Sequence, residues 1–168
     1  MSIADVGGGF GAWTTAFAKW TGPSGRVYST DIGQKQLAFL RETINREKLT
    51  NVTVLEGAER STNLPAGCCD AVLIRDAFHH FTQPADMLRS VVASLKPGGR
   101  LAIIDFPPRP GSDRPQGVPA NRGGHGVPPD VIIDEGTAAG LTLVSQDRQW
   151  SAQGQPSDLF LIVFRKPN

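Results

Sequence analysis

The sequence contains little of what marks several large classes of protein. Its 168 residues include two cysteines, Cys68 and Cys69, which are adjacent and so match neither a disulfide framework nor the ligand spacing of a zinc site. We expect two reduced thiols in a cytoplasmic protein, and no bound metal. No apolar run approaches the roughly 20 residues that a membrane-spanning helix requires. Asp5 interrupts the first apolar segment, so we expect no signal peptide.

The charge balance excludes a further class of partner. Seventeen Lys and Arg residues nearly cancel sixteen Asp and Glu residues, which leaves a formal charge of +1. The sequence has neither a basic block nor a tract in which basic and aromatic residues alternate, so we expect no nucleic-acid partner. Length and composition instead indicate one globular domain over residues 1–168, large enough to bury a hydrophobic core.

Strand and helix patterns alternate along the chain. The periodicity predicts strands at 2–6, 26–31, 51–56, 71–75 and 100–106, and helices at 12–20, 34–48 and 84–95. A last predicted helix at 129–139 precedes a hairpin, with strands at 141–150 and 159–165 and a polar turn at 151–158. This order predicts an α/β fold with a doubly wound, mostly parallel sheet and a C-terminal antiparallel hairpin.

The segment 107–128 differs in character from the rest of the chain. It is rich in proline, glycine and arginine, and it has almost no apolar residues. A loop of this length inside a compact domain is usually functional or mobile. We therefore predict that 107–128 is a substrate or lid loop.

The stretch Asp5-Val6-Gly7-Gly8-Gly9-Phe10-Gly11 joins the first predicted strand to the first predicted helix. Glycine permits a positive φ and leaves no side chain between a ligand and the backbone. A strand, a glycine-rich turn and a helix N-terminus together place bare backbone N–H groups around a polar ligand. Taken alone, the stretch indicates a site for a nucleotide, a dinucleotide or S-adenosylmethionine.

Taken together, the motifs resemble those of the class I S-adenosylmethionine-dependent methyltransferases. The glycine stretch matches the family's acid-x-Gly-x-Gly-x-Gly motif, and Asp31, at the end of the second strand, matches its ribose-binding acid. Small-molecule members such as the ubiquinone/menaquinone biosynthesis C-methyltransferases have segments similar to Leu64-Pro65, Cys69-Asp70-Ala71-Val72, His79-His80-Phe81 and Leu95-Lys96-Pro97-Gly98-Gly99-Arg100-Leu101. The resemblance implies a Rossmann-like, seven-stranded sheet of order 3-2-1-4-5-7-6 with S-adenosylmethionine as cofactor.

The resemblance also implies where that cofactor binds. Asp5 is expected to hold the glycine loop and, through it, the methionine amino group, while Ile32 lies against the adenine ring. A helix cap is the alternative role for Asp31, and a surface ion pair is the alternative for Arg75. The expected cofactor-binding residues are Asp5, Gly7, Gly8, Gly9, Gly11, Asp31, Ile32, Gly57, Ala58, Glu59 and Arg75.

The chain departs from the family pattern in two places. The family usually has a Gly-Asp pair after the third strand, whose acid contacts the adenine amino group. Here the pair is Gly57-Ala58, so Glu59 or the backbone makes that contact, or the contact is missing. Family members also carry helices before the first strand that cover the methionine end of the cofactor. This chain starts inside that strand, so we expect one of three situations. Another subunit of a homodimer supplies the cover, the sequence is a truncated product, or the site is open.

Methyl transfer requires little of side chains, because the sulfonium carries an activated methyl group and alignment supplies most of the rate. His79, His80 and His125 are the candidate general bases, since imidazole titrates near neutral pH. A structural hydrogen bond is the alternative role for each of them. Asp105, which ends the fifth strand, either lines the acceptor pocket or caps a turn.

We therefore predict an enzyme that moves a methyl group from S-adenosylmethionine to a small organic acceptor, at a carbon, oxygen or sulfur atom. Two other functions stay open. Gly7, Gly9 and Ala12 also satisfy the spacing of nicotinamide-dependent oxidoreductases, although such a fold predicts a second parallel half-sheet in place of the hairpin. The other alternative is a module that holds the cofactor without catalysis because its cover is missing.

Overall fold

The computed structural model describes residues 1–151 and 158–168, in which seven strands form one sheet of order β3-β2-β1-β4-β5-β7-β6. Neighbouring strands are parallel except at β7, which runs antiparallel to both β5 and β6. The predicted fold class and strand order are confirmed. The strands are β1 (Ser2–Val6), β2 (Arg26–Asp31), β3 (Val52–Glu56), β4 (Cys69–Arg75), β5 (Leu95–Asp105), β6 (Thr142–Asp147) and β7 (Phe160–Arg165).

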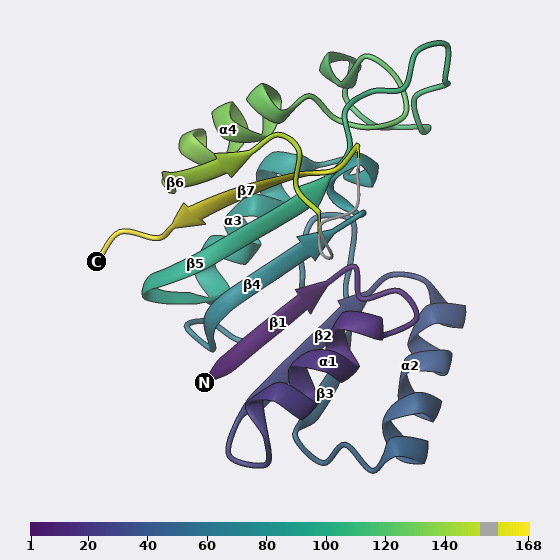
Figure 1. The fold of residues 1–168 in the computed structure, drawn as a ribbon, viewed down its shortest axis with the longest axis vertical. Helices are drawn as coiled ribbons and strands as arrows, with labels where there is room; N and C mark the ends of the chain where they lie inside the picture. The colour runs from purple at the N-terminus through teal and green to yellow at the C-terminus, as the bar shows by residue number, and fades with distance from the viewer. Residues whose placement is uncertain (152–157) are drawn as a thin grey trace.

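Helices cover both faces of this sheet (Figure 1). On one face lie α1 (Ala12–Thr21) and α2 (Gln34–Glu47), and on the other lie α3 (Pro84–Ser94) and α4 (Pro129–Ala138). Because both faces are covered, the central strands bury apolar side chains: Ala4, Val72 and Leu101 are at most 1% exposed. In the described part of the chain, no helix is long and apolar enough to cross a membrane.

Several strand boundaries differ from the prediction; β6, for example, ends at Asp147 instead of residue 150. β4 begins at Cys69 instead of residue 71, and β5 begins at Leu95 instead of residue 100. Leu95 pairs with Cys69, and an irregularity in the register follows before Ala71 pairs with Arg100. The Pro97-Gly98-Gly99 stretch, which lies between the predicted helix and the predicted strand, continues a distorted strand. Cys68 and Cys69 are both free, as predicted.

The predicted loop at 107–128 has more internal structure than its composition indicates. It contains the single-turn helix η2 (Ala120–Arg122), and Val118, Arg122 and Val127 are at most 3% exposed. In Figure 1 the segment lies beyond the carboxyl ends of β4 and β5, at the upper right of the sheet. Of the predicted polar turn at 151–158, residues 152–157 lie outside the described residues.

Candidate active site

The carboxyl ends of β1, β2, β3 and β4 meet at one edge of the sheet, where doubly wound folds bind their ligands. A cavity of about 370 Å³ opens there. It contains eight of the predicted site residues: Gly7, Gly9, Asp31, Ile32, Gly57, Ala58, Glu59 and His80. Asp5, Gly8, Gly11, Arg75, His79 and His125 do not line it.

Two glycines of the loop after β1 are required by close packing as well as by backbone angle. Gly7 has a φ of 73°, and a Cβ there would lie 2.6 Å from the Cβ of Ala77. Gly11, the N-cap of α1, has a φ of 82°, and a Cβ there would lie 2.6 Å from Leu40 Cδ1. A side chain at either position would therefore displace the turn that forms the floor of the cavity.

The sequence led us to expect bare backbone N–H groups in this loop. Three of its glycines instead donate hydrogen bonds to β2. Gly7 and Gly8 both donate to the carbonyl oxygen of Thr30, at 2.8 and 3.1 Å. Gly9 donates to Oδ2 of Asp31 at 2.9 Å. The expectation was wrong at these glycines because β2 supplies their acceptors, and the loop contributes mainly space and shape to the cavity.

Asp5 is buried beneath the loop, where it holds the first helix. Its Oδ2 accepts a hydrogen bond from Thr14 Oγ1 at 2.6 Å, and the same hydroxyl lies 2.9 Å from Ser29 Oγ. Burial raises the pKa of Asp5 to about 6, and the Thr14 hydroxyl partly opposes that shift. The carboxyl is therefore half-protonated near pH 6 and mostly ionised at pH 7, and its bond to Thr14 holds α1 against β1.

Asp31 occupies the position expected of a ribose-binding acid. It ends β2 and lines the cavity, and its Oδ1 accepts from the N–H of Gly33 at 2.8 Å while Oδ2 accepts from Gly9. Beside it, Ile32 is 61% exposed on the cavity wall. An exposed apolar side chain next to a fixed carboxylate suits a ligand that carries both an aromatic ring and hydroxyl groups.

The turn after β3 lines the cavity without an acid at its second position. Ala58 N–H donates to Ser61 O at 2.7 Å, so a short bridge fixes the backbone there. Glu59 also lines the cavity and is exposed.

Arg75 lies outside the cavity lining. Its guanidinium carbon is 5.9 Å from the Trp13 ring centroid, and its buried Nε has no hydrogen-bond partner among the described residues.

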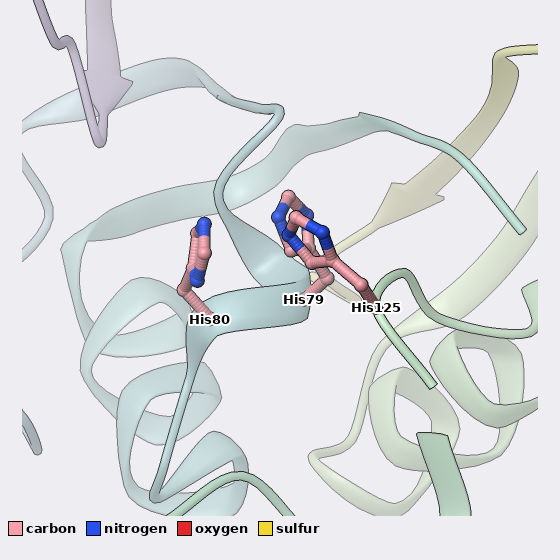
Figure 2. A group of neighbouring side chains, drawn as sticks. All are labelled: His79, His80 and His125. Carbon is pink, nitrogen blue, oxygen red and sulfur yellow. The ribbon is translucent and has the colours of Figure 1, made fainter. Parts of the chain in front are cut away.

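Beyond β4, the three histidines of the chain lie together (Figure 2). His79 and His80 belong to the single-turn helix η1 (Phe78–His80), and His125 reaches them from the 107–128 segment. The His79 ring centroid lies 4.0 Å from that of His80 and 5.0 Å from that of His125. The fold thus joins two of the candidate bases, adjacent in sequence, to the third, which is distant from them.

Asp105 holds His79 at the end of β5. Its Oδ1 is 2.8 Å from Nδ1 of His79, and both side chains are at most 2% exposed. The carboxylate also accepts from the backbone N–H groups of His79 and Phe106, at 3.2 and 2.9 Å. With two backbone donors on this carboxylate, Nδ1–H of a neutral imidazole is its third donor, which leaves Nε2 as the acceptor nitrogen of His79.

His80 and His125 differ in their surroundings. His80 lines the cavity, and partial burial, followed by the neighbouring His79 and His125, lowers its pKa. His125 donates its backbone N–H to Ser112 Oγ at 3.0 Å, while its buried Nε2 has no hydrogen-bond partner. Both rings therefore present nitrogen atoms that no protein group satisfies in the described residues.

Sequence reasoning missed several cavity residues that follow strand ends or lie on helix faces. Asp76, directly after β4, has a φ of 54°, a strained angle for a residue other than glycine. The position after β4 was the only signal for it. The missed lining residues are Val6, Phe10, Thr30, Gln36, Ser61, Thr62, Asp76, Ala77, Phe81, Thr82 and Met87.

Known proteins resemble this chain in both sequence and structure. The model of the methyltransferase domain family matches residues 4–103. The ubiquinone/menaquinone biosynthesis C-methyltransferase UbiE of Pasteurella multocida is 33% identical over 105 residues, which make up 62% of this chain and 39% of that protein. The chain therefore matches about two fifths of the length of this curated relative.

Two solved structures share the fold. A SAM-dependent methyltransferase from Aquifex aeolicus superposes with a TM-score of 0.77 and 24% identity, over 98% of this chain and 81% of that one. Phosphoethanolamine N-methyltransferase 2 of Haemonchus contortus, in complex with S-adenosyl-L-methionine, superposes with a TM-score of 0.77 and 15% identity, over 100% of this chain and 49% of that one. With the glycine turn, the acid after β2 and the strand order in place, the match to the domain model shows that this chain belongs to the methyltransferase domain family.

Proposed function

We propose that the protein binds S-adenosylmethionine in the cavity at the ends of β1, β2 and β3, and transfers its methyl group to a small organic acceptor. The observation that carries the proposal is one cavity of about 370 Å³ that joins the glycine turn and Asp31 to His80. The adenosine fits the end with Asp31 and Ile32. The sulfonium then faces the end with the imidazoles.

Of the three histidines, His80 lines this cavity, and the ring centroids of His79 and His125 lie 4.0 and 5.6 Å from that of His80. The Asp105 carboxylate fixes the ring of His79 and stabilises the cation that forms when Nε2 accepts a proton. Loss of a proton makes an acceptor hydroxyl, or the carbon of a phenol or enol, nucleophilic enough to attack the methyl group. We assign proton acceptance to the pair of His79 and His80, of which His80 lines the cavity and Asp105 holds His79, while alignment in the cavity supplies most of the remaining rate.

We extend the proposal to a carbon acceptor on the basis of the curated relatives. The matched UbiE proteins are named C-methyltransferases of ubiquinone and menaquinone biosynthesis. An electron-rich ring also suits the aromatic side chains of the cavity wall, which are Phe10, His80 and Phe81. A phenol or quinol of modest size is therefore the first acceptor class to test.

Calorimetry with S-adenosylmethionine and with its demethylated product tests cofactor binding first. Asp31→Ala is expected to abolish measurable binding. Glu56→Gln is the matched control, because Glu56 pairs with Asp31 in the sheet register but does not line the cavity. No binding to the wild-type protein at millimolar ligand would refute the proposal.

Turnover is then measured with phenols, quinols, thiols and amines, by release of the demethylated cofactor. Methylated product from the phenols or quinols is the expected result. Intact cofactor binding with no product from any acceptor would instead support the cofactor-binding module, in which case the nicotinamide alternative is checked by titration with the reduced dinucleotide.

A further inference from the structure

The histidine cluster contains more nitrogen lone pairs than proton transfer requires. One nitrogen from each of His79, His80 and His125 lies within 4.8 Å of the other two. The three rings come from η1 and from the 107–128 segment, and in Figure 2 all three project into the same region. Imidazole nitrogens gathered in this way form a donor set that divalent transition-metal ions bind.

The hydrogen bond between Asp105 and His79 has the form that supports a metal ligand. A histidine that binds a metal through one nitrogen almost always donates the other ring N–H to a carboxylate or carbonyl, which fixes the ring and raises its basicity. His79 donates Nδ1–H to Asp105, and so directs its Nε2 lone pair away from β5. Because this pair is buried, its orientation does not depend on solvent.

A second, independent observation comes from His125. Its Nε2 is buried and has no hydrogen-bond partner among the described residues. A buried polar atom without a partner costs roughly 1–3 kcal/mol, and proteins retain such atoms where a ligand satisfies them. The His125 backbone is held on both sides, by Ser112 and by Arg109, so the ring is presented at this position by the fold.

Negative charge is available to balance a dication at this site. Asp105 lies behind His79, and a carboxylate oxygen of Asp76 lies within 4.8 Å of ligand atoms of both residues. A tetrahedral ion with bonds of 2.0–2.1 Å holds its nitrogens about 3.4 Å apart, so the three nitrogens, which lie within 4.8 Å of one another, must move closer to bind an ion. Imidazole ligands suit zinc, and three of them leave one position open, as in zinc sites that take part in chemistry.

We propose that His79 Nε2, His80 and His125 form a site for a divalent transition-metal ion of the zinc type, oriented by Asp105. The site was not expected from the sequence, since His125 is distant from His79 and His80 along the chain and their spacing matches no metal-site pattern. Because His80 also lines the cofactor cavity, the ion lies beside the proposed acceptor. Metal binding itself does not depend on the proposed methyl transfer.

Cobalt and zinc titrations of the full chain, without an affinity tag and after dialysis against a chelator, test this site. Co²⁺ reports its nitrogen coordination through visible absorption bands, and Zn²⁺ is expected to displace it at one ion per chain. His125→Gln is expected to weaken binding by more than the roughly 10–100-fold typical for loss of a group that only orients a ligand. Asp105→Asn is expected to weaken it within that range.

The cysteine pair provides the matched control. Cys68 and Cys69 are the two thiols of the chain and lie at the opposite end of β4, so Cys68→Ala/Cys69→Ala must leave the cobalt bands unchanged. S-adenosylmethionine calorimetry on each variant verifies the fold and separates failure of this site from failure of the proposed function. The proposal is overturned if the wild-type chain takes up no Co²⁺, if His125→Gln binds as tightly, or if the cysteine variant loses the bands.

Discussion

Oδ1 of Asp105 lies 2.8 Å from Nδ1 of His79, at the point where β5 ends beside η1. Both side chains are buried, and the same carboxylate also accepts two backbone N–H groups. The carboxylate therefore sets the ring's tautomer and its direction together. The lone pair that results on Nε2 is the main chemical feature of the acceptor end.

Removing this lone pair is expected to affect the chemical step and not the cofactor. In His79→Gln, kcat should fall by roughly 10²–10⁴-fold, the range for loss of a general base. The affinity for S-adenosylmethionine should not change, because His79 does not line the cavity. Steady-state kinetics with an accepted phenol, alongside calorimetry, measures both. A variant with wild-type kcat would show that the base lies elsewhere.

Zinc and the proton compete for one atom if both assignments for His79 hold. An ion on Nε2 prevents that nitrogen from accepting a proton, so saturating Zn²⁺ is expected to inhibit methyl transfer, and a chelator to restore it. Rates measured across a zinc titration should decline in parallel with metal occupancy. Full occupancy without inhibition would contradict the role of His79 as the base, while leaving the metal site intact.

The pKa of Asp5 predicts how stability depends on pH. Its pKa is about 6 in the folded chain against 3.8 for the unperturbed group, so the folded state binds the proton more tightly. The associated stability is present below about pH 4 and is lost as pH rises through 6, a difference of about 3 kcal/mol. Asp5→Asn removes this titration. Denaturant unfolding should show the variant equal to the wild type at pH 4 and more stable at pH 7.5. Parallel stability curves would contradict this explanation.

An acid at position 58 is expected to improve cofactor binding. Ala58 lines the cavity at the position where the family usually has an aspartate, and its bridge to Ser61 fixes the backbone. Ala58→Asp adds an acceptor for the adenine amino group, and one hydrogen bond to a charged group gives about tenfold tighter binding. Calorimetry compares it with Ala58→Leu, which fills the same space without an acceptor. Unchanged affinity in Ala58→Asp would indicate that adenine lies away from this turn.

The features predicted well from the sequence are those whose conformation depends on residues that are neighbours along the chain. The glycine turn, the acid at the end of β2 and the alternation of strands and helices each follow from neighbouring residues, whereas the strand order was predicted from the resemblance to the methyltransferases. The turn's hydrogen bonding was predicted wrongly because its acceptors, Thr30 and Asp31, lie on another strand.

The acceptor end depends on long-range contacts that a single sequence does not display. His79 and His80 stood out as a pair, but nothing near His125 indicates that β5 and the following segment return it to η1. The role of Asp105 was open for the same reason, since a turn cap and a partner for a distant histidine look alike in sequence. Arg122 was one of several arginines in a polar tract, although its side chain is fully buried.

Arg122 is expected to anchor the segment that presents His125. Its side chain is 0% exposed, donates to both carboxylate oxygens of Glu135 on α4 at 2.8 and 3.0 Å, and lies over the Phe78 ring. Arg122→Met leaves the Glu135 carboxylate without its partner. Loss of one member of a buried pair costs 3–5 kcal/mol, and the partial exposure of Glu135 reduces the expected loss to about 2–3 kcal/mol.

The control for that change is a second ion pair on the same helix. Arg148 contacts Asp130 at 2.6 Å with both side chains more than half exposed, so Arg148→Met is expected to cost less than about 1 kcal/mol. Denaturant unfolding measures the stability of both variants, and limited proteolysis reports whether 107–128 becomes accessible. Because the anchor acts on this segment and not on the cavity, Arg122→Met should also weaken cobalt binding through His125 while cofactor affinity is retained. Equal stability of the two variants would show that the segment is held by Val118 and Val127 alone.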